Sequence, residues 1–189
     1  MKILFEAFVK LPKWYGIIIV LAYSALVAEY MLTLNEQFMF RSIEITGVIK
    51  TFMQISFFVT ILSGIVVWIV LCLLFHLTAL LFNGKAVFGR FLIVSSYPYT
   101  LPALIIFLAI ILLDGIDIVQ TDDVMKALQD DSRFQLIVSL VNYSFIPYYL
   151  LVACIIHYLY NLKWLYALLS VAIPVVSIYA VTELFKLVM

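Results

Sequence analysis

Charged residues are scarce in this chain, and their scarcity argues against a soluble globular domain. Of 189 residues, 12% are charged, with eleven basic and eleven acidic side chains that cancel to a net charge of zero. A soluble globular domain is typically about a quarter charged. Without a net positive charge, the chain also has no global field that would recruit nucleic acid. What it has instead is 67% hydrophobic residues and a mean hydropathy of +1.20, which predict a membrane protein.

Residues with catalytic or cross-linking chemistry are also few. The two cysteines, Cys72 and Cys154, lie inside apolar runs, which favours reduced thiols over a disulfide. No serine stands in a nucleophile-elbow pattern, no His-Glu-x-x-His sequence occurs, and no paired acids lie in an apolar run. We therefore do not expect an enzyme. No cleavable signal peptide is recognisable, so the first apolar run is expected to remain in the protein.

The long apolar runs predict an all-α integral membrane bundle in a single domain, residues 1–189. About twenty apolar residues cross a hydrocarbon core of roughly 30 Å. Before the first span, Lys2, Glu6 and Lys10 recur every four residues up to Pro12, which predicts an amphipathic interfacial helix over residues 1–12. That helix would present a surface to a partner or serve as a plain anchor. Five spans are expected, at about residues 16–34, 54–82, 91–113, 134–160 and 165–187.

The cations predict the orientation of the spans. Six lie on the side of the N-terminus in short segments close to the membrane, where positive charge favours the cytoplasm. They are Lys2, Lys10, Lys13, Lys85, Arg90 and Lys163, against five on the other side, Arg41, Lys50, Lys126, Arg133 and Lys186. We therefore expect a cytoplasmic N-terminus and an outward C-terminus. The acidic segment 114–133, with a short surface helix, would then lie outside.

Two stretches near the span ends contain residues that are unusual in an apolar helix. Glu29 lies close to the end of the first span, where it either snorkels to the interface, the reading we favour, or faces the bundle with a function. Between the second and third spans, Gly84 and Gly89 are expected to let the backbone turn where bulkier residues would clash.

A possible metal site follows from the cysteines and the only two histidines. Cys72 and His76 are four residues apart, and Cys154 and His157 are three apart, so each pair shares one helical face. Because both pairs would lie in the cytoplasmic half of the bundle, four ligands suited to Zn²⁺ or Cu(I) would be available. Packing of the thiols and hydrogen bonding of the imidazoles is the alternative, and we favour it. No other cofactor is indicated.

A third region combines tyrosines with prolines. The third predicted span opens with Tyr97-Pro98-Tyr99-Thr100-Leu101-Pro102, and Pro147 and Pro174 interrupt the last two spans. Such breaks would allow a span to bend, or they would be covered by packing, with tyrosine hydroxyls meeting carbonyls that proline leaves free. We favour packing.

A family resemblance rests on this part of the chain. Leu-Pro-Lys-Trp at residues 11–14, then Phe-Asn-Gly-Lys-Ala-Val-Phe-Gly-Arg-Phe-Leu at 82–92 before the Tyr/Pro-rich span, resembles the prokaryotic branch of the Yip1 family. The resemblance implies a non-enzymatic multi-pass protein of a prokaryotic cytoplasmic membrane. It further implies an accessory or assembly factor, since some relatives are associated with ABC-type exporters. Partners would be lipids, other membrane proteins such as an ABC transporter, or a second copy.

The contact residues expected for such a scaffold are Lys85, Arg90, Tyr97, Pro98, Tyr99 and Pro102. The alternative function is a transporter or metal-handling protein that uses Cys72, His76, Cys154 and His157.

Overall fold

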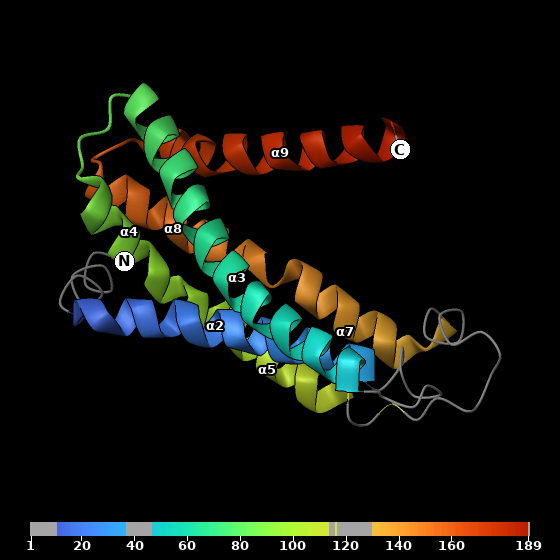
Figure 1. Ribbon diagram of the computed structural model, residues 1–189. Coiled ribbons are helices and arrows are strands. Elements are labelled where there is room, and N and C mark those ends of the chain that lie inside the picture. Colours follow the sequence, from blue (N-terminus) through green and yellow to red (C-terminus); the bar gives the residue numbers. More distant parts are fainter. Residues whose placement is uncertain (1–10, 37–46, 114–115, 117–129, 189) are drawn as a thin grey trace. The chain divides into compact units, whose positions relative to one another are not determined.

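The computed structural model describes residues 11–36, 47–113, 116 and 130–188 (Figure 1). Every regular element in these residues is helical. In chain order they are α2 (Lys13–Leu34), α3 (Gly47–Leu81), α4 (Phe88–Ser96), the 3-10 helix η2 (Tyr97–Tyr99), α5 (Thr100–Leu113), α7 (Ser132–Tyr143), α8 (Phe145–Leu159) and α9 (Trp164–Val188).

The described residues contain five helical segments long and apolar enough to cross a membrane. They are Lys13–Leu34, Gly47–Leu81, Phe88–Leu113, Ser132–Leu159 and Trp164–Lys186. The predicted all-α fold and its five spans are thus confirmed. The second span begins at Gly47, seven residues before the predicted start at 54, because polar residues such as Lys50 and Gln54 do not interrupt helical hydrogen bonding. The interfacial helix predicted at 1–12 and the surface helix of segment 114–133 lie largely outside the described residues.

Two of the five segments are broken near their middle. Between α4 and α5 the chain passes through the 3-10 turn Tyr97–Tyr99, and between α7 and α8 it breaks at Ser144, whose amide and hydroxyl both donate to the carbonyl of Val141 (3.2 and 2.7 Å). Pro102 and Pro147 each stand third in the helix that follows a break. A proline in a first turn removes no intrahelical donor, so each new helix begins without loss of a bond.

The described chain divides into two compact units. Unit 1 comprises Met1–Ile18, Val66–Pro98 and Pro147–Met189, and unit 2 comprises Ile19–Ile65 and Tyr99–Ile146. Two of the unit boundaries lie next to the two breaks, since unit 1 stops at Pro98 and resumes at Pro147, whereas the other two, Ile18/Ile19 and Ile65/Val66, fall inside α2 and α3.

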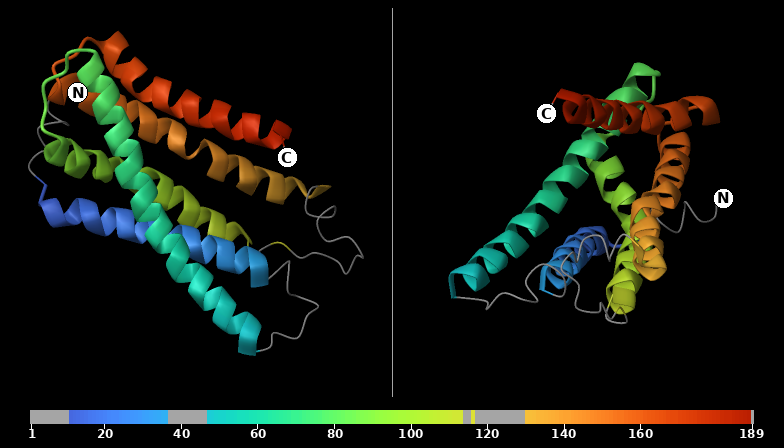
Figure 2. Two further views of the ribbon diagram at one scale, coloured as in Figure 1. Left: turned by 45° about the horizontal axis from the view of Figure 1, so that its top comes forward. Right: turned by 90° about the vertical axis from the view of Figure 1, so that its right-hand side faces the viewer.

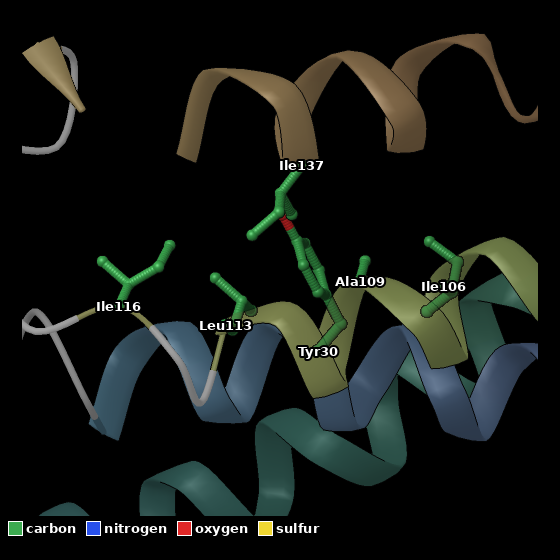
Figure 3. Close-up of a cluster of buried hydrophobic side chains, with 6 residues drawn as sticks. All are labelled: Tyr30, Ile106, Ala109, Leu113, Ile116 and Ile137. Carbon is green, nitrogen blue, oxygen red and sulfur yellow. The ribbon is translucent and has the colours of Figure 1, made fainter. Parts of the chain in front are cut away.

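In unit 2, α2, α5 and α7 share an apolar core (Figure 3). Tyr30 of α2, Ile106, Ala109 and Leu113 of α5, Ile116, and Ile137 of α7 are all buried in it. At the breaks, the rings of Tyr23, Tyr99 and Phe145 contact one another edge to face, with centroids 5.2 to 6.0 Å apart. The rings of the Tyr/Pro-rich region are thus packed against one another, as expected, whereas hydrogen bonds from tyrosine hydroxyls to the carbonyls that proline leaves free stay a prediction.

In unit 1, the C-terminal part of α3 packs with α4, α8 and the first half of α9. Its fully buried side chains include Cys72 and Phe75 of α3, Phe91 of α4, and Tyr148 and Val152 of α8. The start of α2 belongs to this unit because Gly16 lies directly against Ser96 and the carbonyl of Ile93. Among the described residues of unit 1, no charged side chain is buried in this interior.

Candidate functional site

The site is built on two turns at one end of unit 1: residues 82–90, which comprise the connection between α3 and α4 and the first residues of α4, and residues 160–163 between α8 and α9. We call them the paired turns. Both connections lie at the same end of the helices they join (Figures 1 and 2). A backbone hydrogen bond from the amide of Lys85 to the carbonyl of Tyr160 (3.4 Å) links them directly.

The first turn has the hydrogen bonds of a Schellman motif. The amide of Asn83 donates to the carbonyl of Leu80 (2.9 Å), and that of Gly84 donates to the carbonyl of Ala79 (3.0 Å). Asn83 takes the left-handed conformation this motif requires, with φ 63°. These bonds satisfy the last carbonyls of α3, so the turn has a defined geometry.

Of the two glycines of this turn, Gly84 avoids a clash as predicted and Gly89 does not. Neither has a positive φ, because asparagine supplies the left-handed residue instead. Gly84 is nevertheless required by space: a Cβ there would lie 2.8 Å from the carbonyl oxygen of Ala79 and 2.9 Å from the Tyr160 ring. A Cβ on Gly89 would meet no atom within 4 Å, so the prediction that this glycine avoids a clash is wrong.

Tyr160 anchors the second turn to the first. Its side chain is buried, its ring contacts Phe91 edge to face at 5.5 Å, and its hydroxyl shares a 2.6 Å hydrogen bond with Nδ1 of His76. Burial raises the pKa of the Tyr160 phenol, so this hydroxyl keeps its proton. Asn161 follows with φ 54°, the same left-handed conformation as Asn83.

His157 and Trp164 stabilise the second turn by a hydrogen bond and a stacking contact. Nδ1–H of His157 donates to the carbonyl of Leu162, which fixes this tautomer because a carbonyl only accepts. The ring of His157 stacks on Trp164, with centroids 4.8 Å apart and an interplanar angle of 21°. A second stacked pair, Phe82 and Tyr166 at 5.2 Å, spans from the first turn to α9.

The paired turns present positive charge. Lys85, Arg90 and Lys163 are exposed, and none of them forms an ion pair with a described residue. Among the described residues of unit 1 the one acid is Glu183, which is paired with Lys186 at 2.8 Å. The surface of the paired turns therefore has three cations on a fixed backbone and no carboxylate of its own turns to neutralise them.

The other predicted contact residues lie inside the protein. Tyr97, Pro98, Tyr99 and Pro102 are all buried. The hydroxyl of Tyr97 donates to the carbonyl of Leu11 (3.2 Å), and Tyr99 belongs to the aromatic cluster of unit 2. Of the six predicted contact residues, only Lys85 and Arg90 are accessible to a partner.

The predicted metal ligands mostly have other hydrogen-bonding partners. Cys72 Sγ lies 3.1 Å from Ser95 Oγ, while His76 bonds to Tyr160 and His157 to Leu162. Cys154 is half-buried. Within the described ranges, no three histidine, cysteine or acidic side chains are grouped so that they could hold a metal ion. The structure therefore does not gather the four predicted ligands.

The pairing of the turns was missed from the sequence, although a signal exists. Phe82-Asn83-Gly84-Lys85 and Tyr160-Asn161-Leu162-Lys163 share the pattern aromatic, asparagine, any residue, lysine. Asparagine tolerates the left-handed conformation better than most residues, so each copy marks a helix end. Which two ends meet depends on tertiary packing, which this local pattern does not contain.

Fold and site together define the class: an all-α protein whose described residues include five helices long and apolar enough to span a membrane. Comparisons with protein-family models, curated proteins and solved structures find no match to this chain. The resemblance to the Yip1 family accordingly stays a prediction from the sequence.

Proposed function

We propose that this chain is a non-enzymatic multi-pass membrane protein that binds other membrane proteins through its paired turns and serves them as a scaffold or accessory factor. One observation carries the proposal: Lys85, Arg90 and Lys163 are exposed on two turns that hydrogen bonds and aromatic stacking fix to each other. The expected setting is a prokaryotic cytoplasmic membrane, with these turns in the cytoplasm. An ABC-type exporter is the partner that the family resemblance suggests.

The fixed backbone favours a protein partner over lipid headgroups. A fluid headgroup layer adapts to any arrangement of cations, so it needs no rigid turn. A folded partner gains from preorganisation, because less conformational entropy is lost when the contact forms. Three cations without neighbouring carboxylates complement an acidic segment, whose carboxylates would pair with Lys85 and Lys163 and bond in bidentate fashion to Arg90.

The test is quantitative co-purification after cross-linking in intact membranes. The variant Lys85→Glu/Arg90→Glu reverses two charges at exposed positions, so the fold should be retained while repulsion replaces attraction. We expect the cross-linked membrane protein captured by the wild type to fall by at least about tenfold, a change of roughly 1.4 kcal/mol. The captured segment should be acidic by peptide mapping.

Lys186→Gln is the matched control, because it removes an exposed cation far along the chain from both turns and should leave capture unchanged. Equal capture by the charge-reversed variant contradicts the proposal. So does an effect limited to reduced retention of anionic lipid, since that outcome would identify the turns as headgroup contacts.

A further inference from the structure

A second site lies in unit 2, in the groove between the C-terminal half of α2 and the N-terminal half of α3. The two helices are in close contact where Gly64 lies against Ser24, whose side chain leaves no room for a Cβ. From there the N-terminal half of α3 runs obliquely to α2 (Figure 2). The divergence opens a cavity of about 810 Å³, within the usual size range of ligand sites.

Each helix contributes one stripe of residues to this cavity. From α2 and the turn after it come Glu29, Leu32 and Glu36, spaced three and four apart, and from α3 come Lys50, Met53, Gln54, Phe57 and Phe58. Positions at these spacings share one helical face, so both stripes face the same space. The cavity is thus amphipathic, since four of its lining residues are apolar and four are polar.

The charged groups in the lining are not matched to one another. Glu29, Glu36 and Lys50 form no ion pair with any residue in the described ranges. Two carboxylates against one ammonium leave the lining with one excess negative charge. All three side chains are exposed and lie near the ends of their helices, so they are open to a ligand that enters the cavity.

The two phenylalanines of the lining also favour a positively charged ligand. Phe57 and Phe58 contact each other edge to face, with centroids 5.9 Å apart and an interplanar angle of 89°. The negative face of such rings attracts cations, and ammonium groups are held in this way by aromatic walls elsewhere. The carboxylates and the aromatic rings of the lining therefore both favour a positively charged head.

We propose that this cavity binds an amphiphile whose polar head has an ammonium group. Glu29 and Glu36 would hold the ammonium, and Leu32, Met53 and the phenyl rings would contact the apolar tail. Because the cavity lies in the end turns of two spanning helices, such a molecule would enter from the surrounding bilayer. Lys50 would meet an anionic group next to the ammonium, as in a zwitterionic phospholipid.

The experiment titrates three amphiphiles into the full-length protein in detergent and measures saturable binding by native mass spectrometry. They are short-chain phosphatidylethanolamine, dodecylamine and short-chain phosphatidylglycerol. We expect the wild type to bind at least one of the two ammonium amphiphiles at least about tenfold more tightly than phosphatidylglycerol. Glu29→Gln/Glu36→Gln should lose this preference, because the amide keeps the shape and removes the charge.

Two further variants complete the test. Glu183→Gln removes a carboxylate outside the cavity and should leave binding unchanged. Lys50→Gln separates the two sources: weaker binding of phosphatidylethanolamine with unchanged binding of dodecylamine supports a phospholipid, and unchanged binding of both supports a free amine. Absence of saturable binding by both amines, equal binding of phosphatidylglycerol, or unchanged binding in Glu29→Gln/Glu36→Gln would overturn the proposal.

Discussion

At the scale of single residues, Gly84 shows how one absent methyl group permits a tertiary contact. The main chain of the first turn passes so close to α3 and Tyr160 that even alanine would overlap a backbone oxygen. A side chain can rotate away from such a clash, but the carbonyl of Ala79 lies in the last turns of α3 and cannot.

We expect Gly84→Ala to destabilise the protein by about 1 to 3 kcal/mol, the usual cost of overpacking. The measurement is reversible unfolding in mixed detergent, followed by helical circular dichroism. Gly89→Ala is the matched control, because its new Cβ would meet no atom within 4 Å and alanine is the better helix former in α4. Equal stability of the two variants would show that the first turn can shift away from Tyr160.

Residues also show how far the sequence alone reaches. Composition is enough to predict a membrane protein, because the length and apolar character of each span decide by themselves whether it can cross the lipid. Tyr97 and Tyr99 were expected both as packing residues and as partner contacts, and burial excludes direct contact with a partner. The hydrogen bonds that occupy His76 and His157 join residues brought together by the fold, so spacing along the chain could not reveal them.

At the scale of elements, the start of α7 is fixed by a specific side-chain cap. Asp131 precedes α7, and its Oδ1 accepts from the amides of Arg133 and Phe134, both at 2.8 Å. These are two of the donors that the first turn of any helix leaves without an intrahelical acceptor. The sequence predicts a polar segment up to Arg133, and the structure shows that its last two residues, Ser132 and Arg133, form the start of the fourth span.

We expect Asp131→Ala to destabilise the first turn of α7 by about 1 kcal/mol, the usual cost of losing an N-cap. Amide hydrogen exchange at Arg133 and Phe134 should then become faster, since both amides lose their acceptor. Asp130→Ala removes the preceding exposed carboxylate, which caps neither amide, and serves as the control. Unchanged exchange in Asp131→Ala would mean that the helix start is held by packing alone.

At the scale of the whole molecule, five spans require successive connections to alternate between the two sides of a membrane. Two connections separated by one span must lie on opposite sides of the membrane, and two connections separated by two spans must lie on the same side. The distribution of cations predicts further that the paired turns lie in the cytoplasm.

We therefore expect single cysteines introduced at Lys85 and Lys163 to be protected from a membrane-impermeant maleimide in intact cells, and cysteines at Lys50 and Ser132 to react. The background is Cys72→Ser/Cys154→Ser, and permeabilised cells provide the control for reactivity. Labelling of all four positions from one side would contradict the five-span arrangement. A fully inverted pattern would keep the spans and reverse the orientation.

The length of α3 has a consequence for the bilayer around it. Its 35 residues extend about 52 Å, whereas a hydrocarbon core is about 30 Å thick. Even at a tilt of about 40°, the upper end of the observed range, only about 39 Å of the helix would lie inside the hydrocarbon core. Roughly nine residues must therefore emerge from the lipid or thicken it locally, so this chain should partition into the thicker membranes available to it.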